Sequence, residues 1–231
     1  MNYSRKPNAG LRELRDFLEG VRLSVEAVDE QDTETRRLYR KFYSLLIYDF
    51  LLDNESDEDT VSLYARESIS DISHSFFLSF IGLYKPARVC LRSGIENFVR
   101  YILLSNRVDA LAITYLPTLF AEVKSIYADR ASQRARFDVL RSLYAALCQT
   151  VHSTGEEYMN LNVPFSSLLI VDPNKFAVNR ELLLKVCGAI GEIMFVDQQG
   201  LIAKAHHTLR DTLSDNVPPS VRREVREARE I

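Results

Sequence analysis

The chain has 231 residues and a formal net charge of −3, so it has no global basic field to hold nucleic acid, although a local basic face stays open. Its 46% hydrophobic and 26% charged residues are ordinary for a globular protein, and its eight glycines and seven prolines are too few for an all-β sandwich. We therefore predict an all-α fold, a multi-helix bundle with an N-terminal helical extension and a long ordered loop near residues 153–179.

The three cysteines, Cys90, Cys148 and Cys187, lie far apart in apolar, helix-like contexts. This usage is typical of reduced thiols that serve as small core residues, and it indicates a cytoplasmic protein. The charged N-terminus has no apolar core of signal-peptide length, and no window holds about 18 consecutive apolar residues. We therefore expect no contact with a membrane.

Residues 1–53 are predicted to form an N-terminal helical hairpin. Apolar residues recur every three or four positions from Leu11 to Val28, which is the helical period, and a second helix is expected from about Glu34 to Leu52. The acidic stretch Asp53–Thr60 is predicted to be a solvated loop that leads into the next helix. A calcium loop is excluded, because the stretch lacks the central glycine and the terminal glutamate of such a loop.

A helical bundle is predicted over residues 60–215. Gly82 is expected to end one helix and Pro86 to lie in the first turn of the next, while Pro117 is expected to kink or split a third. Pro218–Pro219 ends the bundle, and residues 216–231 form a charged tail that is a solvated helix or a frayed end. The helices are expected at about 61–81, 86–105, 109–127, 134–151 and 180–213.

Arg88, Arg92 and Glu96 follow one another at spacings of four, with apolar residues around them in the helix, so they lie nearly on one face. One interpretation is a structural ion pair between Arg92 and Glu96, or a plain surface stripe. The other is an anion site in which Glu96 holds Arg92 toward a phosphate, since a guanidinium matches the geometry of oxyanions.

His152 lies at the C-terminal end of a predicted helix that also carries Tyr144 and Cys148 on a related face. At this end the helix dipole favours a protonated imidazole, so His152 is either a cap for the last carbonyls or a general acid and base beside a phosphate. No His, Cys or Asp cluster has the spacing of a metal site, and no nucleotide-binding or hydrolase motif is present. We expect no metal and no cofactor.

Two segments carry a resemblance to a known family. The turn Gly82–Tyr84 is followed by a helix of the form A-x-x-x-LRS-x-IEN, from Ala87 to Asn97, and Tyr144–Ser153 is similar to Y-x-x-L-S-x-x-V-H-S. Over about Ser68 to Leu213 the chain resembles the prokaryotic HEPN-type helical bundles. These proteins are often homodimeric, and many are RNases of toxin–antitoxin and antiphage systems.

The resemblance assigns the family histidine to His152, but the arginine that active members carry four to six residues before it is missing here. Arg141, eleven residues before His152, is too distant. Either Arg92 supplies the charge from the neighbouring helix, or this branch has lost nuclease activity. The implied catalytic residues are His152, Arg92 and Glu96, and the implied substrate-binding residues are Arg88, Tyr144 and Ser153.

Three functions are therefore compatible with the sequence. The first is a metal-independent RNase or toxin-type effector of phage defence or stress response, with RNA as substrate and a homodimer completing the site. The second is a catalytically inactive module that oligomerises or binds a protein partner in a defence system. A third, a regulator that binds a small molecule, needs a closed apolar pocket among Phe76, Phe77 and Phe98.

Overall fold

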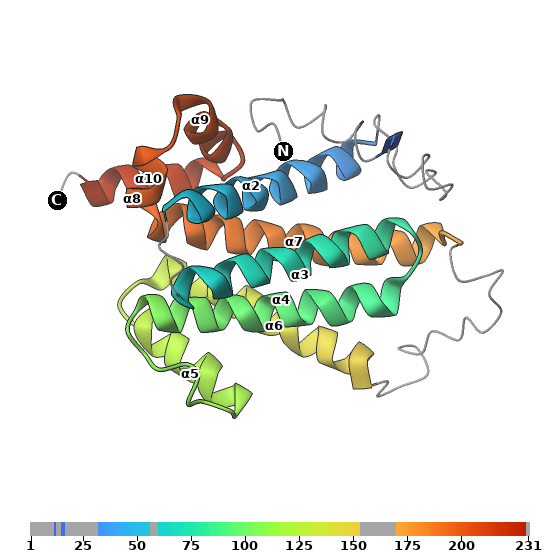
Figure 1. The fold of residues 1–231 in the computed structure, drawn as a ribbon, viewed down its shortest axis with the longest axis horizontal. Coiled ribbons are helices and arrows are strands. Elements are labelled where there is room, and N and C mark those ends of the chain that lie inside the picture. Colours follow the sequence, from blue (N-terminus) through green and yellow to red (C-terminus); the bar gives the residue numbers. More distant parts are fainter. Residues whose placement is uncertain (1–11, 13–14, 17–31, 56–59, 153–169, 230–231) are drawn as a thin grey trace.

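The computed structural model describes residues 12, 15–16, 32–55, 60–152 and 170–229. These residues contain nine helices and no strand, packed as a bundle (Figure 1), so the predicted all-α, multi-helix fold is confirmed. The helices are α2 (Thr33–Glu55), α3 (Thr60–Phe80), α4 (Tyr84–Ser105), α5 (Leu116–Ile126), α6 (Ala131–His152), α7 (Pro173–Asp197), α8 (Gln199–Lys204), α9 (His207–Asp215) and α10 (Pro219–Arg229).

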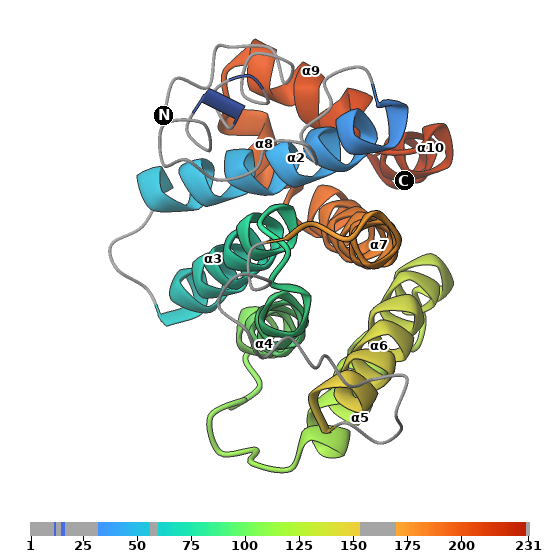
Figure 2. The same ribbon diagram turned by 90° about the vertical axis from the view of Figure 1, so that its right-hand side faces the viewer.

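Helices α3 and α4 form a tightly packed antiparallel hairpin, and α7 runs alongside it. Figure 2 shows α7 between α2, which covers one side of the bundle, and α6, which covers the other. The short helices α8, α9 and α10 gather at one end, near α2 and α7. None of the described helices combines the length and the hydropathy that a bilayer-spanning segment needs.

Gly82 ends α3 as expected, in a turn that no other residue type fits well. Its φ is 81°, in the left-handed region, and a Cβ there would lie 2.5 Å from the carbonyl oxygen of Ile170. The Leu83 amide donates to the Leu78 carbonyl at 2.9 Å, which closes the helix end. The Tyr84 hydroxyl then bonds the backbone of Asp172, so this turn positions the start of α7.

A chain of aromatic rings joins three helices in the core. Phe42 of α2 stacks on Phe76 of α3 with ring centroids 4.4 Å apart, and Phe76 contacts Phe80 at 4.7 Å. Phe80 meets Phe176 of α7 edge to face at 5.0 Å. Phe76 is stacked between its neighbours and Phe98 is only 1% exposed, so both rings belong to the core.

Two expected boundaries in the second half of the chain are wrong. Pro117 lies in the first turn of α5, which begins at Leu116, and it neither kinks nor splits a longer helix. A proline fits the first turn, because its missing N–H would have no partner there. Residues 173–179 belong to α7 and not to the predicted loop. The Asp172 side chain accepts hydrogen bonds from the amides of Asn174 and Lys175 and so caps the start of this helix. Residues 153–169 of the predicted loop lie outside the described residues.

The expected helix over 180–213 is also wrong, because the chain breaks near Gln198 and Ala205 into α7, α8 and α9. The charged segment after Pro218 forms α10, in which Val221 and Val225 are buried and Glu224 lies 2.6 Å from Arg136 of α6. It is therefore a helix with one packed side and not a frayed end. The predicted helix from Leu11 to Val28 lies almost entirely outside the described residues.

Asp32 links the start of α2 to α7. Its carboxylate accepts hydrogen bonds from the Thr35 amide at 3.0 Å and the Thr35 hydroxyl at 2.6 Å, and it pairs with Arg180 of α7. Burial opposes ionisation of this carboxyl, but the hydrogen bonds from Thr35 and Glu34 and the charge of Arg180 outweigh it, so the pKa of Asp32 lies below its ordinary value.

We expect Asp32→Ala to lower the free energy of unfolding at pH 7 by about 1–2 kcal/mol, the usual effect of losing an N-cap. Because the pKa is depressed by folding, the charge-dependent part of this stabilisation is present above about pH 4 and is lost as the pH falls further. Urea unfolding between pH 3 and 7 measures it. Asp32→Asn keeps the cap acceptor and should lose less, and an equal loss in both variants at every pH would contradict this account.

Candidate functional site

The α4–α6 face consists of Arg88 and Arg92 of α4 and of Tyr144, Cys148 and Thr150 of α6. Arg92 meets Tyr144 and Cys148, whereas Arg88, one turn earlier in α4, meets Thr150 further along α6. The two helices therefore run antiparallel here. This geometry brings the predicted residues Arg88, Arg92 and Tyr144 together near the C-terminal end of α6.

Arg92 is held between a sulfur atom and an aromatic ring. Its Nε donates to Cys148 Sγ at 3.3 Å, and its guanidinium carbon lies 5.0 Å from the centroid of the Tyr144 ring. Burial disfavours the charge, but the Cys148 hydrogen bond, Tyr144 and Glu96 outweigh this effect, so the pKa of Arg92 is raised. Arg92 is therefore a permanent cation with a fixed orientation.

Among the described residues, the hydrogen-bond partners of the Arg88 side chain are neutral groups. Its Nε donates to Asn179 Oδ1 of α7 at 2.7 Å, and its Nη1 donates to the Thr150 hydroxyl at 3.2 Å. Asn179, which is 2% exposed, donates in turn to the Ser79 hydroxyl at 3.1 Å. Burial lowers the pKa of Arg88. A half-buried guanidinium held by dipoles keeps its full charge available to an anion.

The predicted ion pair between Arg92 and Glu96 is wrong. Glu96 Oε1 pairs with Arg100 Nη2 at 3.2 Å, and Arg100 is itself anchored on the Ala110 carbonyl at 2.8 Å. In a helix, a glutamate four residues before an arginine forms a more favourable pair than one four residues after it. This order explains why Glu96 pairs with Arg100 and not with Arg92. Within the described part of the chain, neither Arg88 nor Arg92 forms an ion pair with a carboxylate.

Tyr144 has a polar atom without a partner. Its ring is packed on Phe120 at 5.0 Å and lies under Arg92, and the residue is 8% exposed. Its buried hydroxyl oxygen has no hydrogen-bond partner among the described residues. Burial raises its pKa, so the phenol stays protonated and can donate. The hydroxyl is enclosed by the protein beside Cys148, so it helps to shape the wall behind Arg92.

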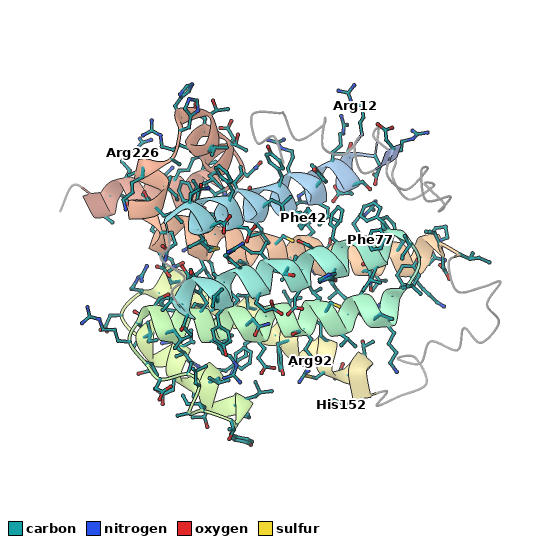
Figure 3. All side chains as sticks on the ribbon, in the orientation of Figure 1. Arg12, Phe42, Phe77, Arg92, His152 and Arg226 are labelled. Carbon is teal, nitrogen blue, oxygen red and sulfur yellow. The ribbon has the colours of Figure 1, made fainter. Side chains whose placement is uncertain are left out.

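His152 is the last residue of α6 and is exposed, one helical turn beyond Cys148. Figure 3 shows Arg92 and His152 on the side of the bundle opposite α2. No described residue is hydrogen-bonded to the imidazole of His152, so the ring is accessible to a substrate or to a second chain. Ser153 lies outside the described residues.

Three contacts of this face were not predicted: those of Cys148, Thr150 and Asn179 with the two arginines. Cys148 and Thr150 lie within the segment Tyr144–Ser153, but nothing in their spacing indicates an arginine partner. Asn179 is a polar residue on an apolar helix 91 positions from Arg88, and such a buried amide signals a partner without identifying it. Among the described residues, no three His, Cys, Asp or Glu side chains lie close enough to share a metal ion.

The fold and this face define an all-helical bundle with a half-buried pair of arginines on one side. No family model matches the chain, and no curated protein or solved structure is significantly similar to it.

Proposed function

We propose that this protein is a HEPN-like, metal-independent endoribonuclease that binds RNA phosphate on the α4–α6 face. The observation that carries the proposal is the pair Arg88 and Arg92, cationic and without carboxylate partners in the described residues. Arg92 lies beside Tyr144 and Cys148, and the exposed His152 is one helical turn beyond Cys148 on α6. Two guanidinium groups suit the oxygens of one phosphodiester.

In the proposed reaction, the 2′-hydroxyl of RNA attacks the adjacent phosphorus, and the 5′-oxygen of the next nucleotide leaves. His152 takes the proton of the 2′-hydroxyl or gives one to the leaving oxygen, and Arg92 stabilises the negative charge on the non-bridging oxygens of the phosphate. One chain offers a single exposed histidine at this face, so a homodimer in which His152 of each copy serves the other role completes the reaction. Contrary to the expectation from the sequence, Glu96 does not orient Arg92 directly, because it is paired with Arg100.

The biological setting that we propose is that of a toxin-type effector of phage defence or stress response, which rests on the resemblance of the segments Ala87–Asn97 and Tyr144–Ser153 to HEPN bundles.

The alternative proposal is a catalytically inactive module that oligomerises or binds a protein partner. Two exposed valines favour it: Val89, 41% exposed beside Arg88 in the chain, and Val178, 54% exposed beside Asn179. Exposed apolar residues next to a polar network are common at protein interfaces. In this alternative the two arginines bind a carboxylate of the partner and not an RNA phosphate.

Purified full-length protein, incubated with end-labelled single-stranded RNA in EDTA, tests the first proposal. We expect cleavage that leaves 2′,3′-cyclic phosphate ends. His152→Ala should cut at least about a hundredfold more slowly while still binding RNA, because one general acid or base contributes a factor of this order. Arg92→Gln should weaken binding and cleavage together.

The matched control is His74→Ala, which removes another exposed helical histidine, on α3. It should cut RNA at the wild-type rate. Wild-type protein that leaves RNA intact but sediments as a stable dimer would overturn the nuclease proposal in favour of the inactive module. Equal cleavage by His152→Ala and wild type would exclude His152 from the reaction.

A further inference from the structure

The first turns of α2 carry four cationic residues, Arg36, Arg37, Arg40 and Lys41. The pairs 36/40 and 37/41 are each four residues apart, so the four side chains form two adjacent rows on the helix surface. They line a cavity of about 570 Å³, and its opposite wall is the connection between α9 and α10. We call this the α2–α10 pocket; its other lining residues are Thr33, Asp215, Asn216, Val217 and Pro218.

The charges in the α2–α10 pocket do not balance. Among the described residues, Asp215 is the only carboxylate in the lining; its side chain is 72% exposed and lies 3.8 Å from Arg222. Glu34 lies 3.5 Å from Arg37, but both side chains are largely exposed, so this pair contributes little. Even without Arg36, the cations Arg37, Arg40 and Lys41 outnumber this carboxylate among the described residues of the pocket, and a positive surplus attracts anions.

The wall of the pocket is already in place. The Asn216 side chain donates to the Arg40 carbonyl at 3.1 Å and to the Ser44 hydroxyl at 2.9 Å. Lys41 Nζ donates to the Asn216 carbonyl at 2.5 Å in the reverse direction. These three bonds join the α9–α10 connection to α2, so an anion would enter a preformed site with little ordering to be done.

Lys41 shows the effect of the crowded charges. Burial lowers its pKa, Glu192 partly offsets this, and the nearby positive charges of Arg37 and Arg40 lower it again. The cations therefore repel one another in the absence of a ligand. An anion with several charges would remove this repulsion, and a single chloride or carboxylate would do so only in part.

We propose that the α2–α10 pocket binds the oligophosphate group of a small molecule, of the kind that nucleoside diphosphates and triphosphates carry. Its volume is within the range of small-molecule sites, and guanidinium groups in two rows suit several linked phosphates. Val217 and Pro218 provide an apolar wall for the remainder of the ligand. The site is separate from the α4–α6 face, because α2 and α6 lie on opposite sides of α7 in Figure 2.

Isothermal titration of the full-length protein with tripolyphosphate and with adenosine triphosphate, both without magnesium, tests the proposal, and adenosine serves as the uncharged control. We expect saturable binding of at least one phosphate probe and none of adenosine. The double variant Arg37→Gln/Arg40→Gln, which changes two exposed side chains, should bind at least about tenfold more weakly, equivalent to about 1.4 kcal/mol. Circular dichroism checks that the variant keeps its helices.

The control Arg134→Gln/Arg141→Gln removes the same charge from exposed positions on α6 and should bind like the wild type. Tighter binding of adenosine triphosphate than of tripolyphosphate would identify a nucleotide site, and equal binding would identify an inorganic oligophosphate site. Absence of binding, equal weakening in both double variants, or binding of long RNA alone would overturn the proposal. None of these outcomes depends on whether the protein cleaves RNA.

Discussion

Replacing Phe80 by alanine is expected to lower the free energy of unfolding by about 3–5 kcal/mol, the usual cost of removing a fully buried phenylalanine. Phe80 is 0% exposed and lies between Phe76 of α3 and Phe176 of α7, with ring centroids 4.7 and 5.0 Å away. The rings around it belong to different helices, so the cavity cannot close without moving α3 relative to α7. A loss of this size approaches the whole stability of many domains.

Urea unfolding followed by circular dichroism measures this effect, and Tyr115→Ala is the control. Tyr115 is 68% exposed, so its removal should change stability by less than about 0.5 kcal/mol. A loss below about 1 kcal/mol for Phe80→Ala would mean that the site is not closely packed. The variant also affects the α4–α6 face, because Phe176 precedes Asn179, the partner of Arg88, by one helical turn.

Gly94→Val is expected to cost about 3 kcal/mol, from overpacking and from the weakening of one buried hydrogen bond. A Cβ at Gly94 would lie 3.0 Å from Ile72 Cγ1 and 3.1 Å from the Ser68 carbonyl oxygen, both on α3. The Ser68 hydroxyl donates to the Gly94 carbonyl at 2.7 Å, so α3 and α4 are in close contact and hydrogen-bonded at this point. The larger side chain forces these helices apart.

Gly188→Ala is the matched control for this prediction. Gly188 is also inside a helix, α7, but a Cβ there would meet no atom within 4 Å. Alanine should therefore stabilise the protein by about 0.5–1 kcal/mol through its better helix propensity. Thermal unfolding of both variants tests this, because the melting temperature should fall for Gly94→Val and rise for Gly188→Ala. If Gly94→Val unfolded at the wild-type temperature, the close approach of α3 and α4 would be contradicted.

Local patterns were sufficient for most of the helices. The period of apolar residues located α2, α3, α4 and α6 to within a few residues, and Gly82 was correctly placed at the end of α3. Errors occurred where a local signal had two interpretations. Pro117 both breaks and begins helices, and only its place after an extended residue, Tyr115, makes it a first-turn proline.

The candidate site also has features that local patterns predicted and features that they did not. The spacing of Arg88 and Arg92 predicted that they share a face, and the motif around His152 predicted the end of a helix; both follow from the geometry of a single helix. The partners of the arginines could not be predicted, because Glu96 is four residues from both Arg92 and Arg100. The contact of Arg92 with Cys148 arises 56 positions away, from the packing of α4 against α6.

By itself, the sequence determined that the chain is helical, which faces of its helices are apolar, and where glycine and proline end or begin them, because these properties depend on neighbours within a few residues. Only the tertiary structure decided which polar groups meet: Arg88 with Asn179, Arg92 with Cys148, and four cations of α2 with the α9–α10 connection. The physical reason is that charge balance and hydrogen-bond partners are set by the packing of distant helices, and the spacing of residues along one helix carries no information about it.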